Sequence, residues 1–307
     1  MSGAQARPAR APRETVEVTR PTSNATLLAR GLARAATGGA KLAGALPDVV
    51  LVRRGVQADP AVLAAYLQLV GEEVRDVLPA GYLHTLAFPV STAMLARPDF
   101  PLPALGMVHL ANRAEVRRPV GVDEVLDARV HAENLVPHRR GTAVDVVAEL
   151  ATDGEVVWRG VSTYLARGVR VPGADRPDDA RRPEWHAPEP TGLWRLGADV
   201  GRRYAEVSGD HNPIHTSRVA ARAFGFARPI AHGMFTAAKA LADVGPAGRG
   251  DAYAWEVEFA TPVLLPATVS VCVTPDDGPG AGDAAGAFTF AAWSRKPHLT
   301  GSVRPLR

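Results

Sequence analysis

The stretch that decides the fold runs from Tyr204 to Val244 and has the sequence YAEVSGDHNPIHTSRVAARAFGFARPIAHGMFTAAKALADV. Within it, a D-x-N-P-x-H run begins at Asp210 and ends at His215. Gly233 follows His215 by 18 residues and opens an apolar stretch with helical spacing. A carboxylate, an imidazole and a helix N-terminus are the groups that an enzyme needs to move protons beside a carbonyl. We therefore place the active site in this stretch.

The spacing of the two proton-carrying side chains predicts a turn between them. Asp210 and His215 are five residues apart, which is not a facing distance on a helix. Asn212-Pro213 lies between them and is typical of a turn, which can fold both side chains toward one point. A carboxylate and an imidazole that share one water molecule can accept and return a proton near neutral pH.

Gly233 is expected to serve the same chemistry through its backbone. An N–H group at a helix start, together with the positive end of the helix dipole, stabilises negative charge that develops on an acyl oxygen. Glycine has no side chain and lets the acyl carbonyl approach closely. Asp210 alone is also compatible with a simple helix cap, but the full pattern with His215 favours catalysis.

The first half of the chain carries a weaker copy of the same pattern. Two pairs of segments align in the same order: residues 65–72 with 203–210, and residues 114–120 with 257–263. Two such matches predict a duplicated unit of about 130 residues. Glu72 stands where the second half has Asp210, but no histidine stands in the first half where the second has His215. We therefore expect chemistry in the second half only.

Each half is predicted to combine a long helix with an antiparallel sheet, an α+β arrangement. Asp59-Pro60 is typical of a helix start, and we expect that helix to continue to Val70. The long apolar helix of the second half is expected at Met234–Val244. Alternating, Val-rich segments predict strands at 114–120, 127–134, 143–151, 155–165, 255–259, 268–274 and 287–294. Pairing of the halves would give one continuous sheet, as in a dimer.

The composition along the chain suggests four regions. The first 22 residues are rich in Ala, Arg and Pro and are expected to be disordered, and a short strap helix is expected to follow between residues 23 and 35. Five prolines among many charges mark a linker in the middle of the chain. The predicted boundaries are 1–45 for the tail and strap, 46–170 for the first domain, 171–190 for the linker and 191–307 for the second.

Charge and cysteine content argue against several kinds of protein. The formal net charge is +3, but residues 1–41 carry about +5 and the remainder about −2, so the basic excess gives no reason to expect nucleic acid. Cys272 is the single cysteine and cannot form an internal disulfide, which fits a reducing compartment. No apolar run reaches the roughly 18 residues of a membrane span, and no signal peptide is evident. We expect a cytoplasmic protein.

The segment Gly209–His215, followed by Gly225–Gly233, resembles the signature of the MaoC-like dehydratases, the family of the R-specific enoyl-CoA hydratases (hydratase 2). The resemblance implies a double hot-dog fold and the reversible hydration of trans-2-enoyl thioesters to (3R)-3-hydroxyacyl thioesters in fatty-acid metabolism, without a cofactor. CoA or acyl carrier protein would carry the acyl group. The family often has Asp-Pro soon after the motif histidine, whereas this chain has Thr216-Ser217-Arg218.

The resemblance assigns catalysis to Asp210, His215 and Gly233, and it makes the first half the wall that accepts the acyl chain. Residues around the motif are expected to contact substrate: Ser208, Gly209, Asn212, Pro229, Ile230 and His232. His232 is more typical of a loop residue that shapes a turn than of a catalyst. No metal is expected, because Pro213 separates the two motif histidines and no third ligand or H-E-x-x-H pattern is evident.

Two other functions remain open from the sequence. A hot-dog thioesterase would use the carboxylate to direct water at the thioester carbonyl, and its product would include a free thiol. A non-catalytic subunit that binds acyl thioesters would show no turnover, although the retained Asp210 and His215 argue against it. The sequence also leaves open whether the protein forms a homodimer.

Overall fold

The computed structural model describes residues 13–19, 45–104, 106–170, 184–276 and 286–306. Within these residues, one 11-stranded sheet has the order β1-β2-β4-β5-β6-β3-β8-β11-β10-β9-β7. The strands are β1 Glu14–Glu17, β2 Val49–Val56, β3 Val108–Val116, β4 Leu126–His138, β5 Gly141–Thr152, β6 Glu155–Arg167, β7 Gly192–Leu196, β8 Tyr253–Phe259, β9 Ala267–Pro275, β10 Phe288–Trp293 and β11 Pro297–Pro305.

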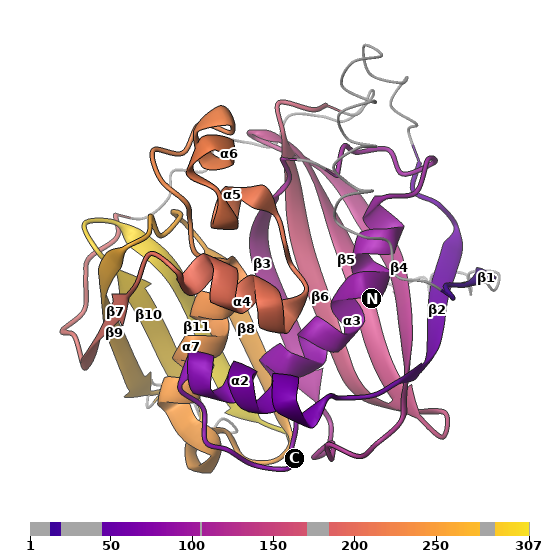
Figure 1. Cartoon of the computed structure of the whole chain (residues 1–307), viewed down its shortest axis with the longest axis horizontal. Coiled ribbons are helices and arrows are strands. Elements are labelled where there is room, and N and C mark those ends of the chain that lie inside the picture. The colour runs from indigo at the N-terminus through magenta and orange to yellow at the C-terminus, as the bar shows by residue number, and fades with distance from the viewer. Residues whose placement is uncertain (1–12, 20–44, 105, 171–183, 277–285, 307) are drawn as a thin grey trace, which may run out of the picture.

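The helices lie together on one face of this sheet (Figure 1). They are α2 Pro60–Val70, α3 Ala80–Leu95, α4 Val200–Ser208, α5 Pro213–Thr216, α6 Arg218–Ala223 and α7 Gly233–Arg249. α3 packs against β4 and β5 of the first half, and α7 packs against β10 and β11 of the second. Each long helix is therefore wrapped by its own half of the sheet.

The sheet is symmetric about the pairing of β3 with β8. Outward from this seam, β6, β5, β4 and β2 follow on one side, and β11, β10, β9 and β7 follow on the other. β3 and β8 pair antiparallel, from Ala111 opposite Glu258 to Val116 opposite Tyr253. The predicted double hot-dog fold with a sheet continuous across both halves is confirmed.

The two short lead-in helices end in the same way. Asp59 caps α2 by accepting hydrogen bonds from the next backbone N–H groups, with Pro60 in the first turn, as predicted. Gly71 ends α2 with a φ of 82°, and Gly209 ends α4 with a φ of 73°. Glycine adopts this left-handed conformation at little cost, so the chain turns sharply before Glu72 and before Asp210.

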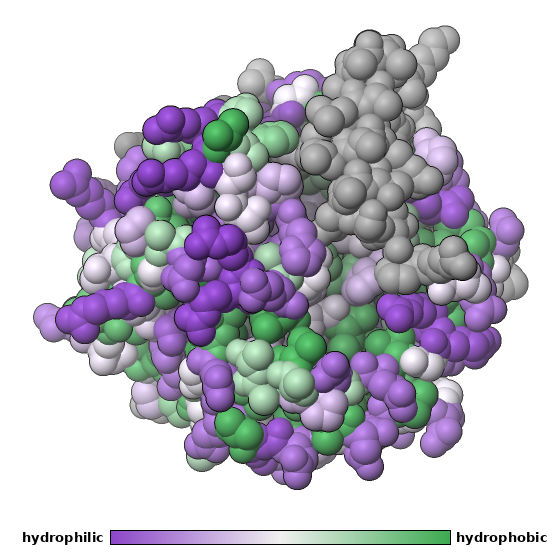
Figure 2. All heavy atoms as spheres, in the orientation of Figure 1, coloured by the Kyte–Doolittle hydropathy of each residue, from purple (hydrophilic) through white to green (hydrophobic). Residues whose placement is uncertain are grey.

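α4 has one charged face toward solvent and one buried face toward the rest of the protein. Its exposed positions are charged, whereas Tyr204 and Ala205 are buried against the rest of the protein. Figure 2 shows hydrophilic side chains gathered over this helix. The pattern is that of a surface helix with one apolar face. No helix in the described part of the chain is both long enough and apolar enough to cross a bilayer.

Several predicted boundaries need correction. The strand expected at 114–120 is found at Val108–Val116, and its end fits Pro119, which has no N–H for a ladder bond. β7 and β11 were not predicted from alternation; β11 has only Leu299 and Val303 fully buried, so its pattern is weak. The long helix continues past Val244 to Arg249, but Gly245 interrupts it with a φ of 75°.

The prediction of disorder for residues 1–22 is wrong at Glu14–Glu17. This segment is β1, which pairs in parallel with β2 at the edge of the first half. The exposed backbone edge of β2 explains why a polar segment can add a strand there without a large apolar contribution. The strap helix expected between residues 23 and 35 lies outside the described residues, as does most of the predicted linker.

Candidate active site

Asp210 is held by a small hydrogen-bonded loop at the end of α4. Its N–H donates to Ser208 Oγ at 3.2 Å, and the Ser208 hydroxyl donates to the Tyr204 carbonyl at 2.7 Å. Asp210 Oδ1 accepts the N–H of Asn212 at 3.2 Å, which makes the local turn that the Asn-Pro pair predicted. The side chain keeps 28% of its exposure, so its carboxylate is still accessible to water.

His215 is presented by the one-turn helix α5. Asn212 begins this helix by accepting the N–H of Ile214 at 3.3 Å, and Pro213 fills the first turn. His215 Nδ1 donates to the carbonyl of Ile230 at 2.8 Å. Because a carbonyl only accepts, the proton is on Nδ1 and Nε2 carries the lone pair. The imidazole is therefore oriented with its basic nitrogen available.

The approach of α4 to α5 depends on a glycine. A Cβ atom added at Gly201 would collide with the backbone carbonyl of His215. Absence of a side chain lets the two helices pack closely, and this brings the end of α4 near the imidazole. The sequence contains this glycine three residues before Tyr204, but its role becomes apparent only from the long-range contact.

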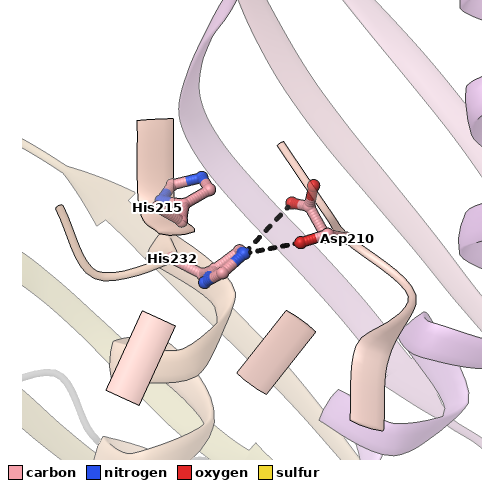
Figure 3. A group of neighbouring side chains, drawn as sticks. All are labelled: Asp210, His215 and His232. Atoms are coloured by element: carbon pink, nitrogen blue, oxygen red, sulfur yellow. Dashed lines mark hydrogen bonds and ion pairs between the residues drawn. The ribbon is translucent and has the colours of Figure 1, made fainter. Parts of the chain in front are cut away.

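His232 lies directly beside both motif residues (Figure 3). Its ring stacks on that of His215 with centroids 3.7 Å apart and an interplanar angle of 26°. His232 Nε2 donates to the backbone carbonyl of Asp210 at 2.9 Å and lies 3.8 Å from Asp210 Oδ2. His232 thus ties the start of α7 to the Asp210 loop, a stronger role than the shaping of its own turn.

Both histidines are neutral at neutral pH. Burial lowers the pKa of His215, and the charge of Asp210 and the bond to Ile230 partly oppose this shift. Burial and the adjacent His215 hold the pKa of His232 well below its usual range. A neutral His215 is the form that can accept a proton from water.

Gly233 occupies the first position of α7, and His232 precedes it as the N-cap residue. The first N–H groups of a helix have no partner within that helix, so this end can receive an oxygen atom of a ligand. A Cβ atom at Gly233 would lie 3.1 Å from the Phe259 ring, which is tighter than normal contact. The glycine therefore has a packing reason in addition to the expected close approach of an acyl group.

The same residues raise the question of a metal ion. Asp210, His215 and His232 each present a ligand atom, and these atoms lie within 4.8 Å of one another. His232 is the third group that the sequence pattern did not reveal. Its Nε2 carries a proton that is donated to the Asp210 carbonyl, so this nitrogen is not in the state of a ligand. The expectation of a metal-free site stays a prediction.

The other residues expected to contact substrate surround Asp210 and His215 and hold the backbone around them in place. The carbonyl of Pro229 accepts the N–H of Leu265 at 2.8 Å, and Ile230 forms an isolated bridge with Leu264. These bonds fix the loop whose carbonyl orients His215. Ser208, Gly209, Asn212, Pro229 and Ile230 thus build the site, while their contact with substrate stays a prediction.

Four residues near the site were not identified from sequence. Tyr204 lies 4.9 Å from the His232 ring, and its pKa is raised by burial and by the charge of Asp210. The charge of Asp210 also acts to raise the pKa of His84 and of Tyr164, although burial has the larger effect on each. The ring of Phe259 packs against Gly233. Tyr204 has a counterpart, Tyr66, in the repeat and could have been found there. The others come from distant strands and helices and leave no local signal.

Comparison with known proteins agrees with this geometry. The family profile described as "MaoC like domain" matches residues 195–278, which contain the whole site. A protein of Mycobacterium tuberculosis (strain ATCC 25618 / H37Rv) named 3-hydroxyacyl-thioester dehydratase X is 39% identical over 263 residues, 85% of this chain and 91% of that protein. The chain belongs to the MaoC-like dehydratase family.

Solved structures of this family share the fold. A crystal structure of HtdX from M. tuberculosis superposes with a TM-score of 0.72 at 36% identity. The match covers 84% of this chain and 100% of the HtdX chain. A MaoC-like dehydratase from Phytophthora capsici gives a TM-score of 0.65 at 18% identity, over 84% of this chain and 95% of that chain, which supports the fold alone. The family predicted from the two sequence motifs is confirmed.

Proposed function

We propose that the second half of this chain adds water to trans-2-enoyl thioesters and removes it from (3R)-3-hydroxyacyl thioesters, in fatty-acid metabolism. One observation carries the proposal. His215 Nδ1 is bonded to the Ile230 carbonyl, so the basic Nε2 is free to act beside the Asp210 carboxylate. The family and the name of the M. tuberculosis relative support the same reaction class.

The geometry suggests how hydration proceeds. A water molecule between Asp210 and His215 donates its two hydrogens to the carboxylate and to Nε2. As the water oxygen attacks C3, either the Asp210 carboxylate or His215 Nε2 takes one proton from the water. Asp210 and His215 then return one proton to C2. The substrate thus gains one H and one OH, and the two side chains end with the protons they began with. The N–H of Gly233 stabilises the negative charge on the thioester oxygen meanwhile. Dehydration is the reverse sequence.

The proposal also covers the acyl chain, its carrier and the location of the protein. We expect the first half to accept the acyl chain, and CoA or acyl carrier protein to carry the thioester. A cytoplasmic location rests on the single cysteine, Cys272, which is buried in β9. The N-terminal domain boundaries and a homodimer are likewise proposals.

A hydration assay tests the proposed reaction. Purified protein is mixed with crotonyl-CoA and with longer trans-2-enoyl-CoA esters, and loss of the enoyl absorbance is followed with chiral analysis of the product. We expect (3R)-3-hydroxyacyl-CoA and no free thiol. Release of thiol would instead identify a thioesterase. No turnover on any enoyl thioester would favour a binding subunit.

A further inference from the structure

A group of polar side chains lies on the helix-facing side of the first half and has no part in the proton chemistry. α3 contributes one of them, β3 two and β6 two. We call this group the polar cluster: His84, His109, Asn112, Ser162 and Tyr164. A register shift in β3 between His109 and Ala111 puts His109 on the same face as Asn112.

Close contacts connect the members of the polar cluster. The His109 ring stacks on Tyr164 with centroids 4.6 Å apart, and His84 lies above it at 6.4 Å. Asn112 Nδ2 donates to Ser162 Oγ at 2.9 Å. Asn112 is 1% exposed and Ser162 is 6% exposed, whereas His109 and Tyr164 are only half-buried. The cluster thus has a partly open end and a buried end.

The open end adjoins the active site. The His109 ring lies 5.1 Å from Phe259, and the same Phe259 ring packs on Gly233. On the other side of the site, the charge of Asp210 is close enough to raise the pKa of Tyr164 in addition to the larger effect of burial. An acyl group bound at Gly233 with its chain toward the first half would meet the polar cluster next.

Two buried acceptors in the polar cluster have no hydrogen-bond partner among the described residues: His109 Nε2 and Asn112 Oδ1. Burial and the nearby His84 lower the pKa of His109 to about 3, so its ring is neutral. A backbone hydrogen bond to Ala111 opposes this lowering of the pKa, and because Nε2 has no partner, we assign that bond and the proton to Nδ1. Nε2 is therefore a bare lone pair. Buried acceptors without donors are destabilising and are expected to meet a group that supplies a donor.

The fold itself does not require polar groups at these places. In the second half, the pair that corresponds to Asn112 opposite Ser162 is Trp255 opposite Val303. Both of these are buried and pack in the apolar core. The same sheet position therefore holds an indole and a valine in one half and an amide and a hydroxyl in the other, and among the described residues Trp255 Nε1 has no hydrogen-bond partner either.

The buried end of the polar cluster is closed. Beyond Ser162 on the same face of β6 come Gly160 and Trp158, and a Cβ atom at Gly160 would collide with the Trp158 ring. Trp158 is 0% exposed and lies 6.4 Å from His84. A pantetheine arm must continue outward to its carrier, so only the free end of an acyl chain can enter a closed end.

We propose that the polar cluster is the subsite for the end of the acyl chain and that it selects chains bearing a hydroxyl group. The hydroxyl hydrogen would be donated to His109 Nε2 or Asn112 Oδ1, the two acceptors that have no other partner. The preferred substrates are then short, oxygenated enoyl or 3-hydroxyacyl thioesters rather than plain alkyl ones. This inference rests on the proposed function, because it takes the acyl chain from Gly233 into the first half.

The test compares substrates within one enzyme preparation. Pairs of trans-2-enoyl-CoA esters with equal numbers of non-hydrogen atoms carry either a terminal hydroxyl or a terminal methyl group. For wild type, we expect kcat/KM to favour the hydroxylated member by about 10-fold or more at one chain length. His109→Phe and Asn112→Leu, which keep shape but remove an acceptor, should bring the ratio close to one. His131→Phe on β4, where His131 Nε2 lies 3.3 Å from Glu133 Oε2, is the control and should leave the ratio as in wild type.

The outcomes separate this inference from the proposed function. Hydration of plain enoyl-CoA with no hydroxyl preference at any length overturns the polar subsite and leaves the reaction intact. No hydration of either series overturns the proposed function. A third series uses thioesters of N-acetylcysteamine, which lack most of the carrier arm. If His109→Phe changes the preference for CoA over this short carrier, but not for hydroxyl over methyl, the cluster binds the carrier and the acyl assignment is wrong.

Discussion

The two halves of the sheet present a carboxylate at the same place with opposite surroundings. Glu72 and Asp210 each follow a left-handed glycine at the end of a lead-in helix. Glu72 forms an ion pair with Arg249 at 3.1 Å, and the two side chains are 4% and 6% exposed. Asp210 is 28% exposed and faces two neutral histidines. The same scaffold thus holds one carboxylate in a buried ion pair and leaves the other partly exposed beside two imidazoles.

The helix N-termini differ in the same way. At the start of α3, the N–H of Ala80 donates to the Tyr253 hydroxyl at 3.0 Å in a buried environment. At the start of α7, the corresponding position is Gly233, which has no side chain between the backbone and an approaching ligand. Tyr253 and Arg249 both come from the second half. Two residues of the second half therefore fill the space beside Glu72 and the start of α3.

Substitution of the two carboxylates should give the largest contrast. Asp210→Asn should lower kcat by about 10²–10⁴-fold, because the amide cannot accept a proton from water. Glu72→Gln should leave kcat within a few fold, but it leaves Arg249 buried without a counter-charge, so we expect the free energy of unfolding to fall by about 3 kcal/mol. Steady-state kinetics and chemical denaturation measure the two effects. Comparable losses of kcat at both positions would mean that both halves supply catalytic groups.

His215 is the imidazole without a counterpart in the first half. His215→Ala should lower kcat by about 10²–10⁴-fold while the thermal unfolding curve stays cooperative. In wild type, kcat/KM should hold as the pH falls to 6.5 and decline only below it, since the pKa of His215 is lowered from 6.5. A pH–rate profile measures this. An acid limb above 6.5, or an alanine variant with nearly full activity, would remove His215 from the mechanism.

Gly233→Ala makes the start of α7 resemble the start of α3, where Ala80 stands. The new methyl group would press on Phe259 and shift the helix start, so we expect kcat to fall by about 10–100-fold with little change in fold. The double variant Gly233→Ala/Phe259→Leu relieves the contact with the ring. Full recovery in the double variant would show that packing, rather than access of the thioester oxygen, requires the glycine.

Acid should destabilise the first half through His84 and His109. Burial lowers the pKa of His84 to about 4 and that of His109 to about 3, whereas both return to 6.5 on unfolding. The unfolded chain then binds more protons, so stability is complete above pH 6.5 and is lost as the pH falls toward 4. At pH 5 we expect a loss of about 2 kcal/mol for each group. Denaturation at several pH values checks this, and His84→Phe should flatten the dependence.

The smallest effect is expected at the edge of the first half. Among the described residues, only this half carries an extra strand, β1; just after it, the N–H of Val18 donates to the carbonyl of Val52 at 2.7 Å. Deletion of residues 1–12 should leave the melting temperature unchanged, while deletion of residues 1–19 should lower the free energy of unfolding by about 1 kcal/mol. Activity should stay near wild type in both. A drop of many degrees with the shorter deletion would mean that residues before β1 stabilise the fold.

The fold and the closeness of Asp210 to His215 were accessible from sequence because both leave local patterns. The duplicated segments and alternating strands predicted two wrapped sheets, and the D-x-N-P-x-H spacing predicted that Asp210 and His215 face one point, which the structure shows. The contacts that Arg249 and Tyr253 make beside Glu72 and Ala80 were not predictable, because both residues are far from the first half in the sequence. The stacking of His232 on His215 and the polar cluster likewise depend on contacts across several elements, which spacing does not encode.

The β3–β8 seam also affects how this protein can evolve. In a dimer of identical chains, every mutation occurs on both sides of the interface, so a residue that closes one site closes the other. Here one covalent chain supplies both sides of the seam, and each position mutates independently. An arginine that neutralises Glu72 therefore leaves Asp210 untouched. Joining the halves in one chain thus lets the two carboxylates acquire different surroundings one mutation at a time.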